Sequence, residues 1–261
     1  MSPKTSKKSL ITLHLAQIPS FFRQPLKTLK NLEQLLEKHP VKRGEWLLLP
    51  EMWPALFDAS QPKKEKLGNA SCYHWLKRFT QSRGCYAVGS MLEMPRSHAY
   101  NTAFVLGPRG QLLERYRKIH LFPLSGEHRQ FKGGHKRVVL NLPAGPLGLA
   151  ICYDLRFPEH FRALVKAGAR WIVVPSAWPA ERREHFEALL KARAIENQCF
   201  VIGINKCGPE KGGMVFGGHS MVLDPWGNCL TKLGAGKTIR RITLDISETH
   251  RIRMRYPFLP F

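Results

Sequence analysis

The chain has 261 residues, 43% of them hydrophobic, which is enough for a sizeable core in one large α/β unit. Lys and Arg number 41 against 19 Asp and Glu, so the formal net charge is +22. No apolar run approaches the ~20 residues that a membrane span requires. The six cysteines are scattered, without a C-x-x-C pair or zinc-type spacing, so we expect reduced thiols in a cytoplasmic protein without membrane partners.

The basic charge has two interpretations. A strongly positive surface attracts polyanions and steers anionic ligands. The basic residues are dispersed along the chain, however, and no recognised nucleic-acid-binding module appears. We therefore favour a solvated basic surface without a nucleic-acid partner. Residues 1–8 are expected to be a disordered basic start, and the segment after them lacks the cleavage pattern of a secretory signal.

Apolar runs alternate with helical patterns along the first half of the chain. The run at 45–50 is continuously apolar, which is typical of a strand buried on both faces of a sheet. The Gly- and Pro-containing segment 107–110 predicts the turn of a hairpin. In chain order, the expected elements are a strand at 9–16, a helix at 22–38, strand 45–50, a helix at 63–82, and strands at 85–92, 100–106 and 111–118.

The second half repeats the alternation of strands and helices. Pro158 near the start and Gly168 at the end delimit one of its helices. A second hairpin is expected around Pro225–Gly227. In chain order, the expected elements are strands at 138–142 and 146–152, a helix at 157–168, a strand at 171–175, a helix at 181–197, a strand at 199–205, the second hairpin and a strand at 238–245.

These elements predict a mixed α/β chain in which hairpins interrupt a strand–helix framework. The two halves show a similar order of elements, without a clear repeat, linker or low-complexity block. We therefore expect a single domain over residues 1–261, built from two packed sheets with helices outside.

Three apolar runs end in residues that are able to take part in catalysis. Glu51 follows a predicted strand, and Lys118 and Cys152 are the last residues of two others. Loops at the carboxyl ends of strands are where α/β proteins build sites, because the scaffold there is rigid. We therefore hypothesise nucleophilic catalysis by the cysteine.

The chemistry of a thiol nucleophile requires these residue types. A thiol must be deprotonated to attack, and a carboxylate can accept its proton and later deliver it to leaving ammonia. A carboxylate alone would raise the thiol pKa by charge repulsion, which a lysine offsets. The lysine also stabilises the oxyanion of the tetrahedral intermediate, and the backbone N–H of Tyr153 is a second candidate donor.

Each candidate also has an ordinary structural explanation. Glu51 fits an exposed loop or a helix N-terminus, and Lys118 fits a surface lysine of a basic chain. Cys152 fits an inert cysteine after a buried strand, as the other five cysteines are expected to be small apolar fillers. Spacing along the chain does not show that the three residues converge in space.

Five motifs make the chain resemble the nitrilase superfamily of carbon–nitrogen hydrolases over nearly its whole length. One motif surrounds each of the three candidates, and the block around Cys152 is the most specific. All five occur in the order that the family shows. They are Leu49–Met52, Tyr116–Phe122, Ile151–Glu159, Lys191–Gln198 and Gly218–Gly227.

The resemblance implies a four-layer α-β-β-α sandwich of two mixed sheets, usually paired as a homodimer or higher homo-oligomer. It implies that Glu51, Lys118 and Cys152 form a catalytic triad. It also implies a second catalytic glutamate, Glu127, which orients the lysine and contacts the substrate amide; its alternative is a surface charge. No metal or organic cofactor is implied.

Other motif residues are assigned to substrate binding or to the scaffold. Trp178 lies in a strand-end loop that lines the pocket in this family, so we expect it and Tyr153 to bind substrate. The alternative for Trp178 is packing on the core. Arg156 either binds a substrate carboxylate or pairs with a neighbour such as Glu159. His120 belongs to the scaffold, as do His219 and an expected Arg193–Glu196 ion pair on one helical face.

The motifs look most like the ω-amidase branch, which implies hydrolysis of 2-oxoglutaramate to 2-oxoglutarate and ammonia. An N-carbamoyl or deaminated-glutathione amidase and a nitrilase remain alternatives, because all would share a thioester intermediate. From a different class, a catalytically weak polyanion-binding protein is the alternative that the +22 charge suggests. Steeply salt-dependent binding to DNA without amide turnover would favour it.

Overall fold

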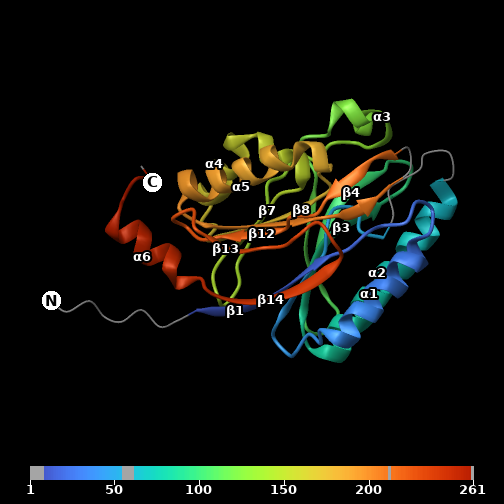
Figure 1. Cartoon of the computed structure of the whole chain (residues 1–261), viewed down its shortest axis with the longest axis horizontal. Coiled ribbons are helices and arrows are strands. Elements are labelled where there is room, and N and C mark those ends of the chain that lie inside the picture. The colour runs from blue at the N-terminus through green and yellow to red at the C-terminus, as the bar shows by residue number, and fades with distance from the viewer. Residues whose placement is uncertain (1–8, 55–61, 211–212, 260–261) are drawn as a thin grey trace.

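Two six-stranded sheets pack face to face and carry helices on their outer faces. The computed structural model describes residues 9–54, 62–210 and 213–259. Figure 1 shows α1 and α2 on one outer side and α4 and α5 on the opposite side, with the sheets between them. This arrangement confirms the expected α-β-β-α sandwich. The expected disordered start at 1–8 lies outside the described residues.

The elements follow the predicted alternation. The strands are β1 Leu10–Gln17, β2 Trp46–Leu48, β3 Tyr86–Glu93, β4 Tyr100–Leu106, β5 Leu112–Arg117, β6 Val139–Leu140, β7 Leu147–Leu149, β8 Trp171–Ser176, β9 Phe200–Asn205, β10 Cys207–Pro209, β11 Val215–Gly217, β12 Met221–Leu223, β13 Cys229–Lys232 and β14 Thr238–Asp245. The α-helices are α1 Pro25–Lys38, α2 Pro62–Arg83, α3 Glu127–Gln130, α4 Pro158–Lys166, α5 Arg183–Asn197 and α6 Ser247–Arg255. Short 3₁₀ helices are η1 Pro123–Ser125, η2 Cys152–Arg156 and η3 Ala180–Arg182.

Both sheets have a parallel centre and antiparallel edges. The first sheet has the order β14-β1-β2-β3-β4-β5, and β1, β2 and β3 run parallel. The second has the order β13-β12-β9-β8-β7-β6, and β7, β8 and β9 run parallel. The parallel centres explain the continuously apolar runs, because these strands are covered on both faces. They also bring the carboxyl ends of several strands to one edge, where loops can build a site.

The core has three apolar layers. The central layer lies between the sheets and includes Leu15, Val88, Leu149 and Ile202, so both sheets share it. A second layer packs α1 and α2 on the first sheet, and a third packs α4 and α5 on the second sheet. Burial of these layers holds the strand ends at fixed positions, because close-packed interiors resist displacement.

Three features differ from the sequence-based expectation. The strand predicted at 146–152 ends at Leu149, and Cys152 instead begins η2. Helices α3 and α6 and the ribbon of β10 and β11 were not predicted. α6 is rich in charged side chains, so its sequence lacks the apolar periodicity that identifies a helix. Of the five cysteines expected to be fillers, Cys229 is exposed on β13 and the other four are buried.

No helix within the described part of the chain combines the length and apolar character needed to cross a membrane.

Candidate active site

The three strand-end candidates meet beside the shared core. Glu51 lies in the loop after β2, Lys118 directly follows β5, and Cys152 lies shortly after β7. All three line one cavity of ≈ 210 Å³. The two sheets are joined here, because the backbone N–H of Glu51 donates to the carbonyl of Ser176 at the end of β8. The structure therefore brings together residues that are up to 101 positions apart, as Glu51 and Cys152 are (152 − 51).

A buried lysine between two carboxylates forms the centre of the site. The Nζ of Lys118 donates to Glu51 Oε1 at 2.8 Å and to Glu127 Oε2 and Oε1 at 2.8 and 3.0 Å. Only 2% of the lysine side chain is exposed. Glu127 begins α3, and its Oε2 also accepts the N–H of Phe122 at 2.7 Å. The expected surface-charge alternative for Glu127 is therefore wrong, because its carboxylate is held against the lysine.

Asn101 completes this group and was not predicted. Its Nδ2 donates to Glu51 Oε1 at 2.8 Å and to Glu127 Oε1 at 3.0 Å. Its Oδ1 accepts a hydrogen bond from the Ser90 hydroxyl at 2.8 Å, and the oxygen of that hydroxyl accepts the N–H of Met52. The sequence feature that could have indicated this role is an Asn near the start of a mostly apolar strand. Such an amide must find partners when buried, so it fixes both carboxylates.

The charge of the site keeps the lysine protonated. Burial by itself lowers the pKa of Lys118, but the negative charges of Glu51 and Glu127 outweigh it and raise the pKa above its ordinary value. A buried cation with permanent partners is a preorganised electrostatic group, which does not have to be assembled when negative charge develops nearby.

Cys152 is a half-buried, neutral thiol at a strained turn. Its φ is +44°, in the left-handed region that a residue with a side chain rarely adopts. Burial and the Glu51 carboxylate raise the pKa of the Cys152 thiol well above its ordinary value, against the opposing charge of Lys118. The thiol thus lies beside the carboxylate that would have to accept its proton.

The two residues expected to bind substrate both line the cavity. The ring of Tyr153 packs against Phe122 and Phe157, with centroids 5.0 and 5.4 Å apart. Trp178 is 4% exposed and packs against Phe186. The indole Nε1–H of Trp178 is buried and has no hydrogen-bond partner among the described residues. The wall therefore contains aromatic surface.

Two arginines also line the cavity. The guanidinium of Arg156 lies over the Trp178 ring at 4.8 Å, and that of Arg182 lies over the Phe122 ring at 5.2 Å. Arg156 also contacts His185 Nδ1 at 3.2 Å, whereas no ion pair with Glu159 occurs between these two described residues. Because the two guanidinium groups stack on the rings through their planar faces, the N–H groups at their edges can donate hydrogen bonds to a carboxylate. Arg182 was not predicted.

The scaffold assignments agree with the structure. Arg193 pairs with Glu196 at 3.0 Å on α5, as expected. His120 lies outside the cavity lining and hydrogen-bonds to Asp154. His219 lies 3.9 Å from Glu187 and is likewise outside the lining.

The sequence matches known proteins over nearly its whole length. The model of the carbon–nitrogen hydrolase family matches residues 12–254. The 2-oxoglutaramate amidase of Bacillus subtilis (strain 168) is 34% identical over 248 residues, which cover 94% of this chain and 95% of the relative. The omega-amidase NIT2 of Mus musculus is 36% identical over 197 residues, 70% of each chain.

A solved structure extends the similarity to the fold. A Glu-to-Gln mutant of the amidase from Nesterenkonia sp. AN1 has a TM-score of 0.82 and 26% identity, covering 99% of this chain and 100% of that one. In that structure, the acetamide moiety of fluoroacetamide is covalently added to the active-site cysteine.

Proposed function

Because this chain belongs to the carbon–nitrogen hydrolase family, we propose that it is a cysteine-dependent amidase whose preferred substrate is a small ω-amide such as 2-oxoglutaramate. The observation that carries this proposal is the buried Glu51–Lys118–Glu127 group beside the thiol of Cys152, in one cavity. Relatives named for this activity support the choice of substrate.

The first half-reaction forms a thioester. Glu51 takes the proton of the Cys152 thiol as the sulfur attacks the amide carbon. Lys118 donates to the oxyanion, and so does the backbone N–H of Tyr153, which lies in the first turn of η2 where N–H groups have no partner within the helix. When the C–N bond breaks, Glu51 delivers the proton to the leaving nitrogen, and ammonia departs.

The second half-reaction hydrolyses the thioester. Glu51, again a carboxylate, takes a proton from water as its oxygen attacks the thioester carbon. The oxyanion meets the same two donors, and the C–S bond breaks. The proton returns to the thiol and the carboxylic acid leaves. In both halves Glu127 and Asn101 hold Lys118 and Glu51 in place through the hydrogen bonds described above.

The cavity supports a small substrate with a negative charge. Its ≈ 210 Å³ lies below the ~300–1,000 Å³ of drug-sized ligand pockets. The amide would lie at Cys152, and a carboxylate at the other end would meet Arg156 and Arg182. Guanidinium groups bind carboxylates through paired hydrogen bonds.

Ammonia release from a panel of amides tests this proposal. We expect 2-oxoglutaramate to give a kcat/KM at least about tenfold above those of neutral aliphatic amides, N-carbamoyl compounds, deaminated glutathione and nitriles, which corresponds to ~1.4 kcal/mol in transition-state binding. Arg156→Gln should raise KM for the acidic amide and leave neutral amides unaffected. Preference for a neutral amide, or for deaminated glutathione, would reject the ω-amide assignment.

We also propose a homodimer. Exposed apolar side chains of α5, of the β12–β13 turn, of β13 and of the segment after α6 support it: Ile195, Trp226, Leu230 and Phe258 are 48%, 47%, 45% and 68% exposed. Tyr256 links two of them, because its ring lies 4.7 Å from Trp226 and 5.8 Å from Phe258. Exposed apolar patches of this kind mark protein interfaces.

Light scattering should give a mass near twice 29.8 kDa, and Trp226→Glu should shift it toward 29.8 kDa. A wild-type mass of 29.8 kDa at working concentration would refute the dimer.

A single domain over residues 1–261 and a cytoplasmic location remain proposals. The core layer shared by both sheets supports the first, and the free state of all six cysteines is compatible with the second.

A further inference from the structure

One buried carboxylate connects the segments that carry the lysine and the cysteine. Asp154 has no exposed surface, and its two oxygens accept four hydrogen bonds. It lies in η2, outside the cavity lining, so it does not touch the substrate space. A carboxylate buried this deeply persists only if its oxygens are satisfied, and here the donors come from both catalytic segments.

On the lysine side, three donors reach Asp154. The N–H and Nδ1 of His120 meet Oδ1 at 3.0 and 2.7 Å, and the hydroxyl of Tyr116 meets Oδ2 at 2.7 Å. The same hydroxyl accepts the N–H of Ile119 at 3.2 Å. Lys118 lies between these residues, so the path of its backbone is fixed on both sides.

On the cysteine side, Asp154 closes the turn that holds the nucleophile. Its Oδ2 accepts the N–H of Ile151 at 2.8 Å, and its own N–H donates to the Ile151 carbonyl at 3.0 Å. Cys152 lies inside this ring, with φ at +44°. Strained backbone persists only where surrounding contacts over-determine it, and Asp154 supplies such contacts.

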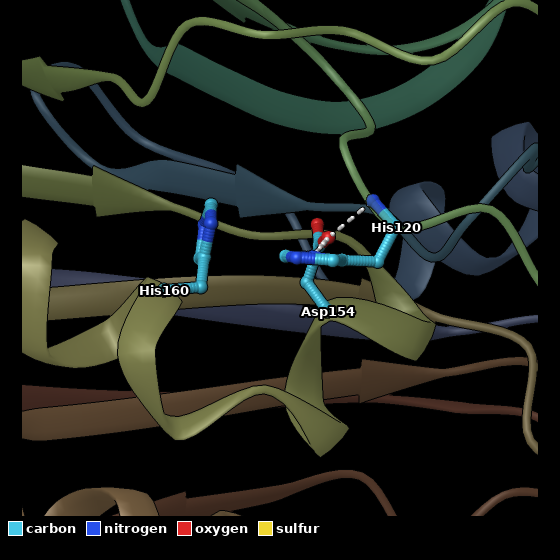
Figure 2. Close-up of side chains that lie close together, drawn as sticks. All are labelled: His120, Asp154 and His160. Atoms are coloured by element: carbon cyan, nitrogen blue, oxygen red, sulfur yellow. Dashed lines mark hydrogen bonds and ion pairs between the residues drawn. The ribbon is translucent and has the colours of Figure 1, made fainter.

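The cluster also has the composition of a metal site, but both oxygens of its carboxylate already accept hydrogen bonds. His120, Asp154 and His160 offer ligand atoms within 4.8 Å of one another. Figure 2 shows His120 directed at Asp154, while His160 projects from α4 beside them. His160 Nε2 contacts the Leu149 carbonyl at 3.2 Å, which requires a proton on that nitrogen. A metal would have to displace hydrogen bonds of Asp154, so the geometry favours a hydrogen-bonded centre.

We propose that Asp154 is a positioning residue that holds Lys118 and Cys152 in register through His120, Tyr116 and Ile151. This role rests on the proposed catalysis by Lys118 and Cys152. It requires an ionised carboxylate, because all four partners donate. Burial alone would raise the pKa of Asp154, but hydrogen bonds from His120, Tyr116 and Ile151 hold it below its ordinary value.

The isosteric variant Asp154→Asn tests the proposal. The asparagine side chain has an NH₂ group in place of one carboxylate oxygen. That NH₂ group would face the N–H or O–H groups that donate to Asp154. We expect kcat to fall about 10²-fold with KM changed less than about threefold, since a misplacement of ~1 Å can cost that much. If Lys118 is held less firmly near the thiol, its charge lowers the pKa of Cys152 less, and less thiolate is present at a fixed pH. Alkylation of Cys152 by iodoacetamide should therefore slow about tenfold, which corresponds to a rise of one unit in the thiol pKa. Peptide mass spectrometry separates Cys152 from the exposed Cys229.

Glu45→Gln is the matched control. Glu45 is also buried, at 6% exposure, and accepts from His14 at 2.7 Å and from the N–H of Lys42 at 2.9 Å. It precedes β2, at the end opposite Glu51, and is outside the cavity lining. This variant should lower Tm without changing kcat or the alkylation rate. If Asp154→Asn behaves in the same way, its role is structural only and the proposal is overturned.

A pair of His120 variants keeps the test valid if Asp154→Asn fails to fold. His120→Asn retains a side-chain N–H toward Oδ1 and should restore most of the kcat that His120→Leu loses. Equal kcat values for the two variants would contradict the proposal. Stoichiometric Zn²⁺ binding that disappears in Asp154→Asn would overturn it in favour of a metal centre. The alkylation rate needs no amide substrate, so it separates failure of this proposal from failure of the amidase assignment.

Discussion

Cys152→Ala should abolish ammonia release, with a loss of about 10⁴-fold or more, as for removal of a nucleophile that acts together with its base and oxyanion donors. The thiol forms the covalent intermediate, and nothing else in the cavity replaces it in that step. The side chain is small and half-buried, so the fold should survive. Ammonia release and circular dichroism measure the two effects.

The exposed Cys229 provides the control for this substitution. Cys229→Ala should keep the wild-type kcat, because the residue lies on β13 and outside the cavity lining. In acid-quenched reactions, wild-type protein should carry the mass of the acyl group and Cys152→Ala should not. Undiminished turnover by Cys152→Ala would reject the thioester mechanism.

Lys118→Met should have the second largest effect, and it should affect both rate and stability. Loss of one oxyanion donor costs ~2.7–4 kcal/mol, or about 10²–10³ in kcat. The substitution also leaves Glu51 and Glu127 buried without their cation, since both lie 2.8 Å from its Nζ. Removing one partner of a buried ion pair costs about 3–5 kcal/mol of the free energy of unfolding.

Two measurements separate these contributions. Urea denaturation gives the loss of stability, and kcat is measured below the start of unfolding so that it reports native molecules. A second variant, Glu127→Gln, removes a charge while keeping the shape, and should lower kcat less than Lys118→Met does. A native-state kcat within tenfold of wild type for Lys118→Met would contradict the oxyanion role of this lysine.

Elements with strong local patterns could be predicted from the sequence. The apolar runs that became β1, β3, β4, β8 and β9 were placed within a residue or two, because burial on both faces requires mostly apolar side chains. β14 was placed equally well, although several of its side chains are exposed. Pro158 and Gly168 delimited α4 correctly to within two residues. α6 and the short β10 and β11 were missed, because packing against the rest of the molecule holds them, not a periodic pattern of their own.

The sequence by itself determined the family, the four-layer sandwich and the candidates Glu51, Lys118, Cys152 and Glu127, because those residues lie in recognisable local motifs. Only the tertiary structure decided which side chains support them. Asn101 bridges both glutamates, Arg182 faces the cavity, and Asp154 connects two segments, yet each is an ordinary polar residue in its own stretch of sequence. Their partners are brought near by the packing of two sheets, and such long-range contacts leave no local periodicity to detect.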